Sequence, residues 1–131
     1  VFTVRMRGGD AKLLCDELMA LSFREFTMII AMTRFALPQA ISVAEAREIF
    51  LSTAPRYRDV KGLLKKHYLL SQDGLSVGGI YLWESLDDAQ AMYTPEWYRF
   101  VEEKYQTQAS VTYFNSPVLV DNLAQQILAE A

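Results

Sequence analysis

The stretch FTMIIAMTRFAL, residues 26–37, most limits what this chain can fold into. It is rich in β-branched and aromatic residues, it has no charge before Arg34, and Pro38 ends it. This composition predicts a central β-strand that is covered on both sides. Its alternate side chains form two apolar sets, Met28, Ile30 and Met32 on one side and Ile29, Ala31 and Phe35 on the other. A sheet built on this strand therefore needs a cover on each face, since a large exposed apolar face is rare in a soluble monomer.

A helix is predicted after this strand, from Val43 to Thr53. Ser42 and Glu45 are three residues apart and have the form of a capping box, and the apolar residues that follow repeat with helical spacing. Because a residue before proline is disfavoured in the α region, we expect the chain to bend at Ala54, before Pro55.

The segment GLLKKHYLLSQDGLSVGGIYLWES, Gly62 to Ser85, predicts a hairpin of two antiparallel strands. The Asp-Gly pair at 73–74 supplies the positive φ that a tight reversal demands, and the glycine at 62 marks the start of the first strand. The glycine pair at 78–79 lies inside the second strand, where it permits a close backbone approach or a bulge.

The sequence leaves two registers of this hairpin open. If Leu70 pairs with Val77, one side of the sheet carries three further pairs, Tyr68 with Gly79, Lys66 with Tyr81 and Leu64 with Trp83. His67 then points to the other side. A slip of one residue places Lys65 and His67 beside the aromatic pair instead. We favour the first register.

Two helix starts are predicted beyond the hairpin. Ser85 and Asp88 form a second capping signature, and Thr94, followed by Pro95 and Glu96, restarts the helix after a break. The restarted helix has an apolar stripe made of Trp97, Phe100, Val101 and Tyr105.

The last predicted elements are a strand and a short helix. Ala109 to Val120 alternates and is β-branched, and Pro117 indicates that its later half lies at an edge or crosses to another chain. Asp121 or Asn122 is then expected to cap a terminal helix that ends in LAQQILAEA.

From residue 26 onward the predicted order is β-α-β-β-α-β. This is the ferredoxin-like α+β unit, a four-stranded antiparallel sheet with helices on one face only. We expect residues 26–131 to form this single domain and residues 1–25 to be an extension with an amphipathic helix that Asp10 caps. The second sheet face is expected to be covered in a homodimer by sheet-on-sheet packing.

Composition excludes several classes of partner and site. The formal net charge of −3 does not favour nucleic acid as a partner, and the single cysteine, Cys15, excludes metal sites built from several thiolates. We expect no metal and no cofactor. The sequence has no apolar run long enough to span a bilayer and no secretory signal pattern, so a cytoplasmic protein with no membrane partner is expected.

The hairpin segment, together with APRYRDVK, YTPEWYRFVEEKY and VTYFNSPVLVDN, resembles the YdhR-type mono-oxygenases of the dimeric α+β barrel superfamily. The resemblance covers residues 26 to about 122 and is strongest over 78–83. It implies a homodimer whose two sheets form a barrel, with a small-molecule cavity in each subunit between sheet and helices. The implied activity is oxidation of a small aromatic or quinol-like substrate without a metal or flavin.

Haem-degrading relatives of this superfamily use an asparagine on the first strand, a tryptophan on the third strand and a histidine on the second helix. Trp83 matches the tryptophan. The first strand offers Thr33 and Arg34 instead of asparagine, and the helix after Trp83 has Met92 and Tyr93 but no histidine. The chain therefore departs from the haem-degrading pattern.

The candidate catalytic residues are His67, Tyr81 and Trp83. The two aromatic side chains can stack on a substrate ring and hydrogen-bond to it, and histidine is the side-chain type that best exchanges a proton near neutral pH. Lys66 or Arg34 can stabilise a phenolate by charge. The full set of candidate ligand contacts is Arg34, Lys66, Tyr68, Tyr93, Trp97 and Tyr113.

Each of these residues also has a purely structural interpretation. The tyrosines and tryptophans can be core or interface residues, His67 can be an interface or solvent residue of a strand, and the lysines can form a solvated rim. The sequence therefore predicts two alternatives, a mono-oxygenase or a non-catalytic protein that binds a small molecule, such as an accessory to a pathway enzyme.

Overall fold

The computed structural model describes residues 2–5 and 28–130, which form two compact units. The larger unit spans Ile29–Phe114. Its elements are β2 (Ile29–Ala36), α2 (Val43–Thr53), the 3-10 helix η2 (Ala54–Tyr57), β3 (Leu63–Leu70), β4 (Ser76–Trp83), α3 (Leu86–Met92), α4 (Pro95–Tyr105) and β5, which runs from Ser110 to Asn115.

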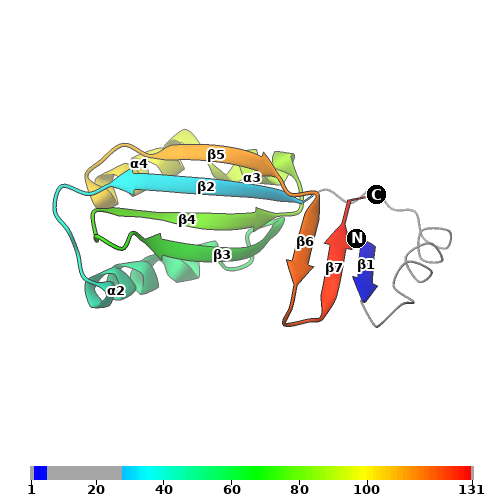
Figure 1. Ribbon diagram of the computed structural model, residues 1–131. Helices are drawn as coiled ribbons and strands as arrows, with labels where there is room; N and C mark the ends of the chain where they lie inside the picture. Colours follow the sequence, from blue (N-terminus) through cyan, green and yellow to red (C-terminus); the bar gives the residue numbers. More distant parts are fainter. Residues whose placement is uncertain (1, 6–27, 131) are drawn as a thin grey trace. The chain divides into compact units, whose positions relative to one another are not determined.

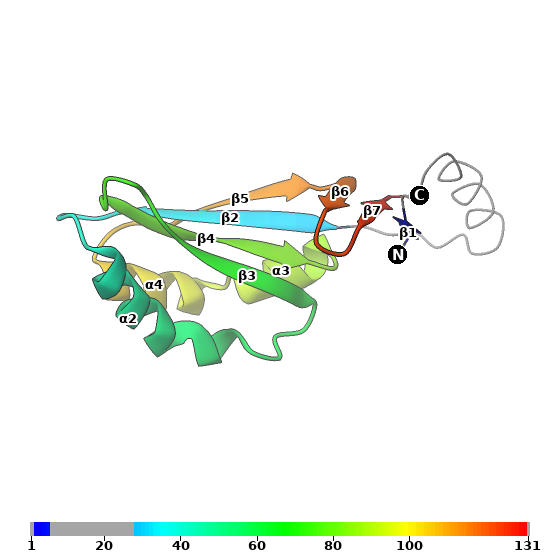
Figure 2. The ribbon, with the colours of Figure 1, turned by 60° about the horizontal axis from the view of Figure 1, so that its bottom comes forward.

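The sheet of this unit has the strand order β3-β4-β2-β5, and its strands are antiparallel (Figure 1). This order confirms the predicted ferredoxin-like fold. Figure 2 shows that α2, α3 and α4 all lie on one side of the sheet. Along β2 the side chains facing the helices are buried, while Met32 and Arg34, which face the other way, are exposed. Within this unit, that second face carries no helix.

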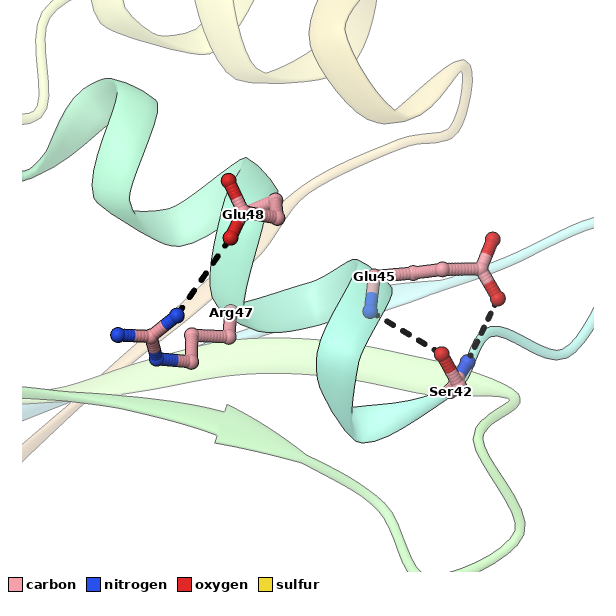
Figure 3. Close-up of polar contacts among 4 residues, drawn as sticks. All are labelled: Ser42, Glu45, Arg47 and Glu48. Atoms are coloured by element: carbon pink, nitrogen blue, oxygen red, sulfur yellow. Dashed lines mark hydrogen bonds and ion pairs between the residues drawn. The ribbon is translucent and has the colours of Figure 1, made fainter.

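The helices begin where the sequence predicts, because local side chains satisfy their first N–H groups. In α2, Ser42 Oγ accepts from Glu45 N at 3.0 Å and Glu45 Oε1 accepts from Ser42 N at 3.1 Å (Figure 3). Ser85 Oγ accepts from Asp88 N at the start of α3, and Thr94 Oγ1 accepts from Trp97 N at the start of α4. All three predicted caps are confirmed.

The hairpin has the favoured register, since Leu70 pairs with Val77 and Lys66 pairs with Tyr81. One pair differs. Leu63, not Leu64, lies opposite Trp83, because the register shifts between residues 63 and 65. The irregularity is therefore at the start of β3 and not at the glycine pair.

Gly78 allows the predicted close backbone approach. A Cβ placed on it would collide with the carbonyl oxygen of Thr33 on the neighbouring strand. The close contact between β2 and β4 therefore requires glycine at this position.

The expected bend at Ala54 is wrong. Ala54 has φ −54° and ψ −41°, in the right-handed helical region, and the chain continues into η2 with Pro55 in its first turn. A new 3-10 turn accepts proline at its start because the missing N–H needs no partner there. The backbone becomes extended only at Arg58.

The smaller unit contains a three-stranded sheet of β1 (Phe2–Arg5), β7 (Gln126–Ala129) and β6 (Val118–Asp121), in the order β1-β7-β6. The predicted terminal helix is wrong. Asp121 Oδ1 accepts from Leu123 N and Ala124 N, which makes a turn, and the chain returns as β7 between two antiparallel partners. The strand predicted over 109–120 divides around Pro117, and β6 lies at an edge of its sheet, as predicted. The predicted first helix, after Asp10, lies outside the described residues.

Candidate functional site

The helix-covered face of the sheet carries a continuous group of aromatic side chains. Tyr81 and Trp83 alternate along β4 and are 2% and 0% exposed, and their rings stack with centroids 6.4 Å apart. Tyr93, after α3, lies edge-on to both rings, at 5.3 and 5.9 Å. Trp83 Nε1 donates to Tyr93 Oη at 3.2 Å. The polar atoms of Trp83 and Tyr93 are thus paired with one another inside the core.

A second part of this aromatic group connects α4 to η2. Trp97 Nε1 donates to Tyr57 Oη at 3.1 Å, and the Trp97 ring lies 4.9 Å from the Tyr93 ring. Tyr113, on β5, is edge-on to Tyr93 at 5.9 Å. Burial raises the pKa of Tyr81 and of Tyr93 far above the usual range of a phenol. Both hydroxyls therefore stay protonated at neutral pH and are not bases.

Lys66 is the one basic group that β3 turns toward these rings. Its Nζ lies 3.4 Å from the ring centroid of Tyr57, 3.6 Å from that of Tyr68 and 4.7 Å from that of Tyr81. No carboxylate of residues 28–130 lies within 4 Å of this Nζ. Burial lowers the pKa of Lys66 to about 7. The three ring faces favour the charged amine, so the position holds a lysine that can exist in either form near neutral pH.

Two spaces meet at Lys66. The inner one is a cavity of about 20 Å³ between the sheet and α4, and its lining includes Thr33, Phe35, Val101 and Tyr105. The outer one is a more open hollow of about 400 Å³, lined in part by Arg58, Leu63 and Lys65. Tyr57, Lys66 and Tyr68 belong to both linings and so form the wall between the two spaces.

The inner cavity is much smaller than the resemblance implied. Pockets that bind small organic ligands usually measure about 300–1,000 Å³, so of the two spaces that meet at Lys66 the outer hollow is ligand-sized and the inner cavity is not. The aromatic side chains expected to line an internal cavity are instead packed against one another. The space of this size lies beside Lys66, Tyr57 and Tyr68.

Seven of the nine candidate residues lie on the helix-covered face, namely Tyr81, Trp83, Lys66, Tyr68, Tyr93, Trp97 and Tyr113. His67 and Arg34 do not. Side chains alternate along a strand, so His67 on β3 and Arg34 on β2 point to the opposite face, where both are exposed. His67 thus points away from the aromatic group, as the favoured register predicts, and the roles of His67 and Arg34 stay predictions.

Sequence reasoning missed Tyr57 and Thr53 as site residues. Tyr57 lies on η2, whose four residues have no periodic pattern to show which way a side chain points. Thr53, the last residue of α2, shares a hydrogen bond of 2.8 Å between its Oγ1 and Tyr68 Oη. The fifteen-residue separation of these partners leaves no local signal in the sequence.

The described residues contain neither a metal-binding cluster nor a membrane-spanning helix. Among residues 2–5 and 28–130, no group of three or more His, Cys, Asp or Glu side chains is placed to hold a metal ion. In the same part of the chain, no helix has the length and apolar character needed to cross a bilayer.

The fold is that of a class of small ferredoxin-like α+β proteins that includes mono-oxygenases. A mono-oxygenase from the gene ActVA-Orf6 of Streptomyces coelicolor, in complex with nanaomycin D, matches 72% of this chain and 92% of its own, with a TM-score of 0.57 and 16% identity. SnoaB, a cofactor-independent oxygenase from Streptomyces nogalater, matches 72% of this chain and 98% of its own, with a TM-score of 0.54 and 17% identity. No protein-family model and no curated protein matches the sequence. These similarities confirm the fold, and membership of the YdhR-type branch stays a prediction.

Proposed function

We propose that this protein is a cofactor-independent mono-oxygenase that oxidises a small phenolic or quinol-like substrate bound in the outer hollow against Lys66. The single observation that carries the proposal is the position of Lys66. Its amine lies among three tyrosine rings at the boundary between solvent-accessible and buried space. The fold shared with two oxygenases is consistent with this chemistry.

The first step is removal of a proton from the substrate hydroxyl. A phenol has an ordinary pKa of about 10, and the neutral amine of Lys66 can accept its proton. The resulting ammonium then stabilises the phenolate by charge in a partly dry site. Since the pKa of Lys66 is about 7, a substantial fraction of the amine is neutral at physiological pH.

The oxidation then follows from the electron-rich phenolate. It transfers one electron to dioxygen, and the superoxide adds to the ring carbon para to the hydroxyl, a position that carries a hydrogen atom in the substrate. Loss of water from this adduct gives the quinone, so one oxygen atom enters the product and the other leaves in water. The substrate supplies both the electrons and the two hydrogen atoms of that water. Exposed tyrosine and leucine surface beside Lys66 provides the apolar wall for the ring.

Oxygen consumption with a panel of phenols and dihydroquinones tests this proposal. Lys66→Met, which keeps the length of the side chain but removes the base, is expected to lose about 10²-fold or more in rate. Lys61→Met is the matched control, because Lys61 is 92% exposed and lies outside both spaces. Oxygen consumption that is equal in the two variants would exclude Lys66 as the base.

A non-catalytic binding protein is the second candidate, and the packing of the aromatic side chains favours it. Tyr81, Trp83 and Tyr93 are occupied with one another and leave no ligand-sized space among them. Saturable binding of a phenol in the hollow, with no oxygen consumed by the wild-type protein, would support this candidate and exclude the oxygenase.

We also propose that the protein is a homodimer in which a second copy covers the helix-free sheet face. Support comes from the apolar residues on that face, among which Met32, Leu69 and Phe114 are 39–47% exposed. A cytoplasmic location remains part of the same proposal.

A further inference from the structure

The hydroxyl of Thr33 is a buried polar group without a partner. Thr33 lies in the middle of β2, is 2% exposed, and its Oγ1 makes no hydrogen bond with the described residues. A buried hydroxyl that lacks a partner costs free energy, and such groups in native proteins are generally paired with protein or with an ordered water. The neighbourhood of Thr33 is therefore the place to look for a bound molecule.

A small cavity lies beside Thr33. The register places Tyr68, Gly79 and Thr33 side by side on the helix-covered face, and the Lys66 side chain and the Tyr81 ring lie over the glycine. The cavity of about 20 Å³ is lined by Thr33 and Tyr68. A volume of roughly 10–15 Å³ measured in this way is enough for one water, so the cavity holds a single small molecule and nothing larger.

A second polar group reaches the same cavity. Lys66 lines it, and the side chain crosses Gly79 with Cε 3.3 Å from the position of a Cβ on that glycine. The titratable groups around the amine are Tyr57, Tyr68 and Tyr81, whose ring faces it contacts, and Lys104 and Tyr105, which line the cavity from α4. Lys104 Nζ is directed to Ser52 Oγ at 3.3 Å.

We propose that this cavity binds one water molecule, hydrogen-bonded to Thr33 Oγ1 and to Nζ of Lys66. A water can accept from the ammonium and donate to the neutral amine, and the threonine hydroxyl can likewise donate or accept. The pair thus gives Lys66 a hydrogen-bond partner in both protonation states, whereas a carboxylate would strongly favour the charged form. The inference rests on the proposed function, because a catalytic base must be both protonated and deprotonated in each reaction cycle. Thr33 is then a positioning residue for Lys66.

Crystal structures of the wild type, Thr33→Val and Thr33→Ser, at a resolution that reveals ordered waters, test the site directly. We expect a water in the wild type and in Thr33→Ser, and none in Thr33→Val, which has nearly the same shape without the hydroxyl. A wild-type cavity without a water would overturn the proposal, and so would a water that stays in Thr33→Val. The wild-type structure decides even if the valine variant does not fold.

The NMR titration of ¹³C-labelled lysine provides the second readout. The water bonds more strongly to the ammonium than to the neutral amine, because hydrogen bonds to charged groups are the stronger ones, so the pKa of Lys66 is expected to be lower in Thr33→Val than in the wild type by up to about one pH unit. Thr33→Ser is expected to keep the wild-type value, and the exposed Lys61 serves as an internal control. An unchanged Lys66 titration in Thr33→Val would contradict the role of the water. Neither readout uses oxygen turnover, so failure of this site and failure of the proposed oxygenase are distinguishable.

Discussion

At the scale of single residues, Lys66 is subject to two opposing effects. Burial favours the neutral amine and lowers the pKa to about 7, whereas the ring faces of Tyr57 and Tyr68, 3.4 and 3.6 Å from Nζ, favour the ammonium. A carboxylate in this place would hold the lysine permanently charged. The tyrosines instead keep the amine close to its point of titration, which is the property that a base working at neutral pH requires.

This position makes stability depend on pH in a defined direction. The pKa of Lys66 is about 7 when folded, whereas an unfolded lysine has a value near 10.5, so between these values the unfolded chain binds more protons. The free energy of unfolding of the wild type, relative to Lys66→Met, is therefore expected to rise with pH above 7, by at most about 1.4 kcal/mol per pH unit. Urea unfolding at a series of pH values between 6 and roughly 10 measures the difference. Lys61→Met, compared in the same way, should show no such slope, and a flat difference for Lys66→Met would mean that its amine stays charged throughout.

At the scale of elements, a local capping interaction fixes where α2 begins. Its capping box joins Ser42 and Glu45 through two hydrogen bonds, both on the exposed surface (Figure 3). The same figure shows the ion pair of Arg47 with Glu48, whose atoms lie 3.5 Å apart at 70% and 75% side-chain exposure. These two surface contacts are expected to contribute very differently to the free energy of unfolding. A cap satisfies N–H groups that have no helical partner, whereas an exposed ion pair competes with water.

Ser42→Ala is expected to lower the free energy of unfolding by about 1 kcal/mol, because it removes the acceptor for Glu45 N. Arg47→Ala, the matched control on the same helix, is expected to change it by less than about 0.5 kcal/mol. Chemical denaturation of the two variants measures both values. Equal losses would show that the cap contributes no more than the surface ion pair.

The contact between β2 and β4 gives a second prediction for an element. Gly78→Ala is expected to cost more than about 2 kcal/mol, because the new Cβ meets the backbone carbonyl of Thr33, which cannot move without parting the strands. Gly79→Ala, the control, meets atoms at 3.0 Å or more, and the nearest belongs to the Tyr81 ring, so a smaller loss is expected. Thermal unfolding compares the two. If Gly79→Ala proved the more destabilising variant, backbone approach would not be the reason for glycine at 78.

The boundaries that the sequence predicted correctly are those with a local cause. Ser42, Ser85 and Thr94 cap their helices with side chains three residues from their partners, and the Asp-Gly pair turns the hairpin with Gly74 at φ +74°. The errors have non-local causes. Residues 126–129 become a strand because β6 and β1 supply partners on both sides, and the shift near Leu64 depends on the pairing of whole strands. Thr33 is similar, since only the sheet register brings this residue to the lining of the cavity beside Lys66.

At the scale of the whole molecule, the helix-free face of the larger sheet exposes apolar side chains that need a cover. Its central strands, β2 and β4, present Met32 and half-buried apolar residues such as Ile80, while Lys65 and His67 lie on the edge strand β3. A groove of about 320 Å³, lined in part by Met32, Leu69 and Gly78, follows this face. An apolar centre with polar residues at the margin is typical of a protein–protein interface, and the face is the same on every copy, so a two-fold dimer can cover both at once.

This geometry predicts that Met32→Lys converts the protein to a monomer. Met32 is 39% exposed in the single chain, so a lysine there costs the isolated subunit little, but a two-fold contact would bury two like charges near its centre. Leu51→Lys is the matched control, because Leu51 is 53% exposed on α2, on the helix side of the sheet. Analytical ultracentrifugation at micromolar concentration should give a dimer for the wild type and for Leu51→Lys and a monomer for Met32→Lys, with unchanged far-ultraviolet circular dichroism in all three. A wild-type monomer would show that the apolar face is covered by something other than a second copy, and a dimeric Met32→Lys would move the interface away from this face.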